Sequence, residues 1–594
     1  MGLETKEKGT KEKGTKKKGS KKKRIFVEHK PVVVGSMIAA VAIAGMVGGI
    51  IWYIEAIQQG KMKDTLISSY DGLWFNDTLW EDWWGYGAAL TAQMIINQIA
   101  EGLFQYEIIE DYTRIAPCLA LNGTWSPDGL NFTCHLRRDA KFHDGTPFNA
   151  TAVKWNFDRL QNLLNNMSYS GIWYDFEGNM ILNRTEIIDT YIVKFVLNRP
   201  FIPFPSMLCS LQSSILSPRI AQLNDFIEVD TNLIGTGPFK YDSSTYLYEP
   251  IYMLYYTVNT TLLANPDYWG GPPKLNKLIF KYFENNTERY EKMIKGEIDL
   301  TYLYPWAPEN YTDHPEITLN YIDTSMVNYV LIDNSLINAT MRKALSYAVN
   351  YSKILDIERP RYEGGVIRAR SPLSKGVLYS NWEDFELPYY NITIARQVLK
   401  DVNWNGTAGA LTANDNITTG NEWENLVTAG NPLAIYNFTY VVTSWWHNAY
   451  KDLVTENFKQ IGIELNPIPL ATWWEYRISA NSQFLIVGWY PDYNDPSSCI
   501  NPMFSNKADG FENWGQVNDT LVQQWMDAAL IEKNETTRER LFYNIQKRLI
   551  EEVYPCMWTY TERYCNIHGP NLRGINYNLW PYKESFKEAY FQLV

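Results

Sequence analysis

The chain of 594 residues contains few cysteines and histidines, the side chains that form zinc sites and the nucleophile–base pairs of catalytic triads. It has six cysteines and six histidines, the histidines are scattered, and no Cys-x-x-Cys pair occurs. No spacing of cysteine and histidine matches a zinc site. These shortages argue against a metal centre, a catalytic triad or a cofactor. We therefore expect a protein that binds its target and is not an enzyme.

Basic charge is also scarce over most of the chain. Residues 1–30 hold twelve Lys or Arg against four Glu, a net charge of about +8. Because the whole chain has a formal net charge of −12, the remaining residues carry about −20. A polyanion repels nucleic acid at long range, so we expect neither DNA nor RNA as a partner.

The basic start precedes an uncharged apolar run. Residues 1–30 repeat Lys, Gly and small hydroxyl residues, which predicts a disordered cytoplasmic tail. The run PVVVGSMIAAVAIAGMVGGIIWYI has 24 residues, enough to cross a bilayer as one helix. A cleaved signal peptide is the alternative, but its apolar run is shorter, about 7–15 residues. We predict an uncleaved single-pass anchor over residues 31–55, with its basic side in the cytoplasm and the main domain outside the cell membrane.

The part after the apolar run is rich in Asn-x-Ser/Thr sequons, which are usable only on the exported side. A chain rich in Asn and Thr also forms sequons freely, which is the alternative to heavy glycosylation. Asn149 heads one sequon, but we expect it to cap a helix and not to carry a glycan as well. The predicted glycosylation sites are Asn76, Asn122, Asn131, Asn166, Asn183, Asn259, Asn285, Asn310, Asn338, Asn350, Asn391, Asn405, Asn416, Asn437, Asn518 and Asn534.

All six cysteines follow the apolar run, and their even number suits disulfides in an exported domain. None follows the run closely, so no cysteine is placed for lipid attachment. Two pairs flank turn-containing segments and could join neighbouring strands, and a third pair remains by elimination. The candidate disulfides are Cys118–Cys134, Cys556–Cys565 and Cys209–Cys499.

Past the apolar run, β-branched or aromatic runs alternate with helical stretches, which predicts an α/β protein of two or three domains. Helices are expected over 88–103, 339–355 and 449–461, and a strand over 189–198. Residues 403–431 are rich in Asn, Gly and Thr and predict an exposed loop or small insert. Aromatic residues make up 15% of the chain, and we assign most to packing and a few to a recognition cleft.

The segment KFHDGTPFNATAVKWNF, residues 141–157, places His143 beside Asp144. Side chains of adjacent residues tend to point apart, which argues against a catalytic or metal-binding pair. Gly145 permits positive φ and Pro147 cannot continue a strand ladder, so HDGTP is typical of a turn. Asn149 can then cap a helix with one apolar face.

The stretch LRRDAKFHDGTP resembles the LR-x-x-x-x-F-H-D-G-x-P signature of extracytoplasmic solute-binding proteins of family 5, the peptide- and nickel-binding proteins of ABC importers. Other segments resemble that family in its order: EGLFQYE, GTGPFKY, ANPDYWGGPPKLNKLIFKYF, KGEIDL and FLIVGWYPDYNDPSS. The resemblance covers about residues 65–594. It implies a bilobal, periplasmic-binding-protein-like α/β fold with an extra subdomain, preceded here by the single N-terminal transmembrane helix.

By the same resemblance, the chain crosses between two lobes more than once. Lobe I takes residues 60–115, 236–322 and 550–594, the extra subdomain takes 116–235, and lobe II takes 323–549. The glycines of GTGPF suit a tight crossing between lobes. A hinge motion then encloses the ligand, which excludes water and strengthens buried polar contacts.

In peptide-binding members, the aspartate of the motif GWYPDYNDP pairs with the α-amino group of the peptide, and the matching residue here is Asp492. Gly488 and Trp489 precede it in family register and are expected to supply backbone and ring contacts. Trp558 is a weaker candidate for the cleft. The alternative is that Asp492 only caps a turn. One departure is Tyr490, which stands where the family disulfide is attached.

The resemblance predicts a membrane-anchored extracellular protein that captures peptides between two lobes and delivers them to the permease of an ABC importer. The sequons, the anchor and the missing lipid cysteine suggest an archaeal cell. One alternative keeps the fold and binds oligosaccharides, and another is a structural surface-coat or filament glycoprotein. A glycoside hydrolase with Asp492 and Asp495 as its carboxylate pair is disfavoured, because nothing in the sequence sets their separation.

Overall fold

A computed structural model describes most of the chain beyond the apolar run. The described residues are 63–70, 90–109, 112–166, 171–175, 178–219, 233–249, 254–283, 285–303, 314–361, 365–401, 405–406, 409–410, 420–472, 475, 482–507, 513–577 and 585–592. The predicted tail over 1–30 and anchor over 31–55 lie outside them. Of the helices in these ranges, none is both long and apolar enough to cross a membrane.

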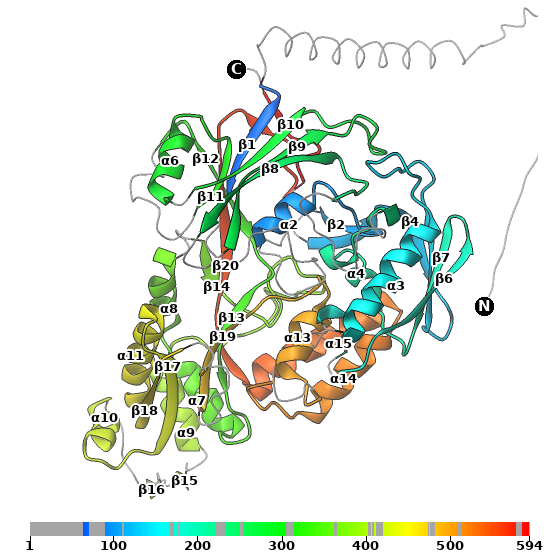
Figure 1. The fold of residues 1–594 in the computed structure, drawn as a ribbon. Helices are drawn as coiled ribbons and strands as arrows, with labels where there is room; N and C mark the ends of the chain where they lie inside the picture. The colour runs from blue at the N-terminus through cyan, green and yellow to red at the C-terminus, as the bar shows by residue number, and fades with distance from the viewer. Residues whose placement is uncertain are drawn as a thin grey trace, which may run out of the picture. The chain divides into compact units, whose positions relative to one another are not determined.

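A twelve-stranded mixed sheet is the largest element of the described chain (Figure 1). Its path is β18-β17-β19-β13-β20-β11-β1-β10-β9-β8, and β12 and β14 also pair with β20. The strands are β1 (Thr65–Tyr70), β8 (Phe239–Glu249), β9 (Leu254–Ala264), β10 (Lys277–Tyr282), β11 (Leu300–Leu303), β12 (Thr318–Asp323), β13 (Val327–Ile332), β14 (Val366–Arg368), β17 (Ala434–Val441), β18 (Ile463–Leu470), β19 (Phe484–Trp489) and β20 (Cys556–His568).

The long strand β20, red in Figure 1, joins two parts of this sheet. Its first half pairs with β13 and β14, and its second half pairs with β11 and β12. With 13 residues it spans about 40 Å. One strand therefore takes part in both halves of the sheet.

Two large hydrophobic cores correspond to the two parts of the sheet. The first contains apolar residues between Leu66 and Tyr302 and others near the C-terminus, and the second runs from Val327 to Tyr560. Leu300 of β11 belongs to the first core and Met557 of β20 to the second. The predicted lobe boundaries stay predictions, but the second core extends to Tyr560, past the boundary placed at 550.

A four-stranded antiparallel sheet contributes to the first core. Its order is β4-β5-β7-β6, and the helix α3 packs on β6 and β7. Val153, Phe157 and Leu160 of α3 are buried along one helical face, as their spacing predicts. The elements here are β2 (Phe104–Ile109), β3 (Tyr112–Pro117), β4 (Ala120–Trp125), β5 (Asn131–Leu136), α3 (Ala150–Asn166), β6 (Leu182–Asp189), β7 (Ile192–Leu197) and α4 (Phe204–Met207).

Helices pack against the second core. They are α7 (Ala339–Ala348), α8 (Tyr351–Glu358), α9 (Ile392–Asp401), α10 (Gly420–Thr428), α11 (Trp445–Lys459), α13 (Pro496–Phe504), α14 (Thr520–Ile531) and α15 (Glu535–Arg548). The helix expected over 339–355 is two helices, because Asn350 interrupts it. The Asn350 side chain caps α8, and its backbone N–H donates to Asn457 Oδ1 at 2.8 Å.

Other elements differ from expectation at their ends. The helix expected over 88–103 is the shorter α2 (Leu90–Ile96), after which the chain turns. The strand expected over 189–198 is β7, and α11 begins at Trp445, four residues before the predicted start. The predicted insert over 403–431 contains α10, whose Trp423 is fully buried. The remaining described elements include α6 (Asn286–Ile294), β21 (Leu572–Arg573) and β22 (Tyr590–Phe591).

The six cysteines are free thiols, so the structure contains none of the three predicted disulfides. Cys556 and Cys565 lie nine residues apart on the single strand β20, about 30 Å from each other. A disulfide requires Cα atoms about 4.4–6.8 Å apart, so this pairing was wrong. Cys118 and Cys134 are both buried in the first core, but the Cys118 thiol donates to Glu101 Oε1 at 3.7 Å. Cys209 likewise donates to a backbone carbonyl and is not bonded to Cys499.

Candidate functional site

The loop between β19 and α13 holds the predicted ligand-binding aspartate, and Ser498 fixes its conformation. The indole N–H of Trp489 donates to Ser498 O at 2.8 Å. The backbone N–H of Asp492 donates to Ser498 Oγ at 2.9 Å. Ser498 itself is buried in the first turn of α13. We did not identify Ser498 as important from the sequence. Its position in DPSS indicates only that it lies in the first turn of a helix.

This loop passes from the second core to the first. Trp489 packs against the second core, whereas Tyr493 is buried in the first. The backbone N–H of Asn494 donates to the hydroxyl of Tyr106 at 2.8 Å, and its carbonyl accepts from Ser206 Oγ at 3.1 Å. Asp492 lies between these two attachments, and its side chain is exposed.

A cavity of about 250 Å³ lies beside the loop, between residues of the two cores. Asp492 is not among the residues that line the cavity, whereas Asn494 and Asp495 of the same loop are. The lining includes Tyr106, Trp125, Ile202, Ser206, Tyr379, Asn494, Asp495 and Arg538.

The second aspartate of the motif has a structural role. Asp495 caps α13 and forms a two-pronged ion pair with Arg538, both N–O distances being 2.8 Å. Both side chains are buried. Burial lowers the pKa of Arg538, but the charge and hydrogen bonds of Asp495, together with Tyr379 and Tyr493, outweigh burial, and the pKa of Arg538 is raised. Asp495 is therefore committed to this pair, whereas Asp492, three residues earlier in the loop, is exposed.

The other predicted site residues lie in packed surroundings. Gly488 pairs with Asn328 of β13, and a Cβ on Gly488 would lie 2.1 Å from Met326 Cε and 2.3 Å from Asn328 Oδ1, so a larger residue would require both side chains to move. Trp558 is 2% exposed, with its ring edge-on to Tyr329 and Phe504. Because Trp558 is enclosed in the second core, it has no free ring face for a ligand, and we no longer count it among the candidates.

Tyr490 connects the loop to β20. Its hydroxyl donates to Glu562 Oε1 at 2.6 Å, and Glu562 is 8% exposed on β20. Tyr490 stands where the sequence resemblance places a disulfide, and it forms a hydrogen bond to the shared strand instead.

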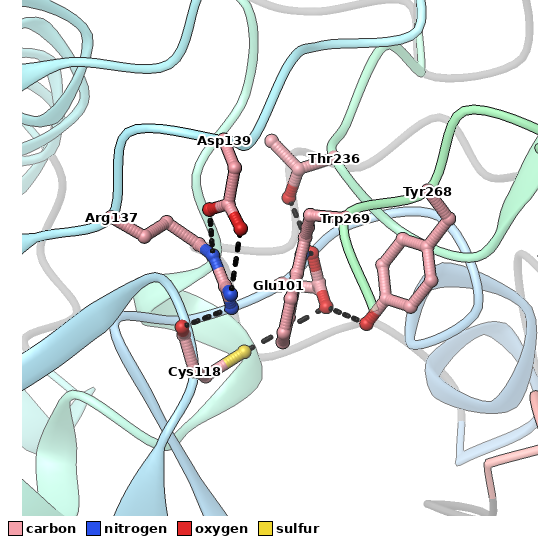
Figure 2. Close-up of polar contacts among 7 residues, drawn as sticks. All are labelled: Glu101, Cys118, Arg137, Asp139, Thr236, Tyr268 and Trp269. Atoms are coloured by element: carbon pink, nitrogen blue, oxygen red, sulfur yellow. Dashed lines mark hydrogen bonds and ion pairs between the residues drawn. The ribbon is translucent and has the colours of Figure 1, made fainter. Parts of the chain in front are cut away.

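A second polar cluster gathers around Glu101, which follows α2 (Figure 2). The carboxylate accepts hydrogen bonds from Tyr268 OH at 2.6 Å, Thr236 Oγ1 at 2.7 Å and Trp269 Nε1 at 2.9 Å, besides the contact with Cys118. Burial raises the pKa of Glu101, and the hydrogen bonds only partly oppose this. The cluster joins four segments that are far apart in the sequence.

Arg137 adds to this cluster by lying over the ring face of Trp269 (Figure 2). Its guanidinium carbon lies 3.2 Å from the ring centroid of Trp269, and it forms an ion pair with Asp139 at 2.8 Å. A cation on the indole face makes the indole N–H a stronger donor to Glu101. The segments EGL, GTGPF and NPDYW were each recognisable in the sequence, but nothing local indicated that they meet at one carboxylate.

His143 and Asp144 belong to a turn, as predicted. His143 Nε2 donates to Gly237 O at 2.9 Å, while Asp144 accepts from Thr146 and from Ser217 Oγ. The two side chains form hydrogen bonds with different residues and not with each other. The turn thus binds the GTGPF segment, where a Cβ on Gly237 would lie 2.6 Å from the carbonyl of Gln98.

Comparisons with known proteins agree with this architecture. The model of the middle region of the bacterial extracellular solute-binding proteins, family 5, matches residues 114–511. Heme-binding protein A of Haemophilus influenzae is 25% identical over 484 residues, covering 77% of this chain and 80% of its own. Glutathione-binding protein GsiB of Escherichia coli is 24% identical over 524 residues, covering 86% and 90%.

Solved structures share the fold at lower identity. HbpA2 of Haemophilus parasuis has a TM-score of 0.72 at 20% identity, covering 89% of this chain and 100% of its own. The periplasmic binding protein DppA of Helicobacter pylori, in complex with the peptide STSA, has a TM-score of 0.61 at 20% identity, covering 90% and 100%. The motifs, the fold and the family match lead to one conclusion: the chain belongs to family 5 of the extracellular solute-binding proteins.

Proposed function

We propose that this protein captures peptides outside the cell, between its two lobes, and delivers them to the permease of an ABC importer. The observation that carries the proposal is the placement of Asp492. Its backbone is held by Ser498, its neighbours attach to different cores, and its carboxylate is exposed where the chain passes from one core to the other. An exposed carboxylate on a fixed backbone can pair with the ammonium group of a peptide once the lobes enclose it.

In this proposal Trp489 and Gly488 form the part of the site that lies beside the peptide ammonium group. The Trp489 side chain is half-buried and held by its indole hydrogen bond, so the exposed part of the ring has a set orientation. Gly488 contributes no side chain of its own at this position of β19, where Met326 and Asn328 lie beside the backbone. Residues 31–55 anchor the protein in the cell membrane, and the sequons carry glycans on its outer side.

The test compares peptide binding to the wild-type protein and to Asp492→Asn by calorimetry. We expect the substitution to weaken binding by about 10- to 100-fold, because a charge-assisted hydrogen bond contributes about 1.5–3 kcal/mol. An N-acetylated peptide should bind both proteins equally weakly, since it lacks the ammonium group. Equal affinity of both proteins for the free peptide would refute the role of Asp492.

A second experiment distinguishes between the alternative ligands. A panel of peptides, glutathione, heme and oligosaccharides is screened by thermal shift, because a ligand at 100 times its dissociation constant stabilises the protein by about 2.7 kcal/mol. Stabilisation by oligosaccharides alone would favour the sugar-binding alternative. No stabilisation by any of these solutes, together with self-association, would favour the structural coat protein.

A further inference from the structure

Among the described residues, five predicted glycosylation asparagines, and Asn149, which also heads a sequon, occupy the same structural position, the N-cap of a helix. In each of them the side-chain oxygen Oδ1 accepts a hydrogen bond from a backbone N–H in the first helical turn. We name these residues the capping sequons. They are Asn149 of α3, Asn285 of α6, Asn338 of α7, Asn350 of α8, Asn391 of α9 and Asn534 of α15.

The cap uses one end of the amide and leaves the other available. The hydrogen bonds to Oδ1 are 2.8–3.2 Å long, as in Thr287 N to Asn285 and Lys353 N to Asn350. Within the described chain, the Nδ2 atoms of the capping sequons make no hydrogen bond. Because Oδ1 points toward the first turn, Nδ2 points away from it. Asn285, Asn338 and Asn534 are exposed, and the other three are half-buried.

The third residue of the sequon is also accessible in this position. It lies at the second helical residue, where the hydroxyl side chain faces solvent. Thr151, Thr287, Ser352, Thr393 and Thr536 are exposed, and Thr340 is half-buried. A transferase that must contact both the asparagine and the hydroxyl residue can reach both at a helix start.

A sequon on a strand shows the opposite arrangement. Asn183 lies in β6, and its Nδ2 donates to Asn198 Oδ1 at 2.6 Å. Its hydroxyl partner Thr185 is 2% exposed. The acceptor nitrogen is thus held by a hydrogen bond, and the hydroxyl is buried.

We propose that the capping sequons are the occupied N-glycosylation sites of the folded protein and that each asparagine caps its helix and carries a glycan at the same time. The co-reactant is an oligosaccharide linked through phosphate to a lipid. A bond forms between Nδ2 and the anomeric carbon, the bond from that carbon to the phosphate oxygen breaks, and one amide hydrogen leaves as a proton. The product keeps Oδ1 and one N–H, so the cap survives. The proposal differs from our expectation that Asn149 caps a helix and carries no glycan.

The inference rests on the proposed location outside the cell and does not depend on the ligand. Failure of peptide binding therefore leaves it intact, and unmodified asparagines leave the peptide test intact. The first experiment maps glycopeptides of the full chain, isolated from its native cells, by mass spectrometry. We expect glycan on the capping sequons and none on Asn183. Unmodified capping sequons, or Asn183 modified as fully as they are, would overturn the proposal.

The second experiment separates cap from glycan at Asn534. Asn534→Asp keeps a capping oxygen without an acceptor nitrogen, Thr536→Val keeps the cap and breaks the sequon, and Asn534→Ala removes both. We expect Asp and Val variants to lose the glycan with little change in Tm, and the Ala variant to melt about 1–2 °C lower. Glycosylated wild-type protein should melt no lower than Thr536→Val. A wild-type Tm as low as that of Asn534→Ala would show that the glycan displaces the cap and would overturn the proposal.

Discussion

At the scale of single residues, two side chains tie distant segments together, and His143 is the first. Its ring is held by Gly237 O, and its backbone N–H donates to Gly235 O at 2.9 Å. Burial lowers the pKa of His143 to about 4 from its ordinary 6.5. The neutral ring is therefore part of the joint between the HDGTP turn and the GTGPF segment.

His143 should make the protein sensitive to acid. With a lowered pKa, the unfolded chain binds the proton first, so the stabilisation is complete above pH 6.5 and is lost as pH falls toward 4. We expect wild-type stability to fall by about 3 kcal/mol between pH 7 and 4 relative to His143→Gln, which keeps the donor and does not titrate. Urea unfolding of both proteins at each pH measures this difference. His135→Gln, at an exposed position of β5, is the control, and equal pH profiles of the His143 variant and wild type would contradict the prediction.

Glu101 is the second such residue. Replacing it with alanine leaves the donors of Tyr268, Thr236 and Trp269 without an acceptor, at about 1–3 kcal/mol each. We expect Glu101→Ala to lower the free energy of unfolding by about 3–5 kcal/mol. Glu101→Gln should cost less, because its oxygen still accepts from Trp269 and Thr236 and its amide can donate to Tyr268. Equilibrium denaturation measures both, and a loss below about 1 kcal/mol for the alanine variant would count against the cluster as a structural joint.

At the scale of elements, single residues at helix ends and sheet edges determine where a helix starts and whether a strand can pair further. β18 is an edge strand of the large sheet and contains Pro467 and Pro469. Proline removes a backbone donor, which discourages pairing with another chain at that edge. The break between α7 and α8 follows the same logic, since Asn350 starts a new helix where the chain could have continued the old one.

The ion pair between α13 and α15 is a contact between elements that a single mutation can break. Asp495 at the start of α13 pairs with Arg538 in α15. Arg538→Met leaves a buried carboxylate without its partner, and we expect a loss of about 3–5 kcal/mol. Adding Asp495→Asn should recover much of this loss, because asparagine still caps α13. Denaturation of the single and double variants tests the coupling, and additive losses would show that the pair does not interact as described.

At the scale of the whole chain, two cores share one strand, and the thiols are distributed over both. Burial raises the pKa of Cys118, Cys134, Cys499 and Cys556, so these thiols should react slowly in the native protein. The half-buried Cys209 should react first with iodoacetamide. After unfolding without reductant, mass spectrometry should find six alkylated cysteines. A lower number would demonstrate a disulfide that the structure lacks.

Local chemistry was enough for the features that depend on a few neighbouring residues. The HDGTP turn, the cap by Asn149 and the apolar face of α3 follow from turn propensity and helical spacing, and the motifs together indicated the family. Those interactions act over one or two turns of chain, so the order of residues specifies them. Sequence alone also distinguished the basic start from the acidic remainder.

Tertiary structure decided where distant segments meet. The burial of Trp558, the position of Cys556 and Cys565 along one strand, and the convergence on Glu101 depend on how β20 and the GTGPF segment pair with chain more than a hundred residues away. Such pairing is set by the packing of whole cores, because no local pattern records which strand will lie beside another. The same packing leaves Asp492 exposed between two fixed attachments, while Asp495, three residues later, is buried against Arg538.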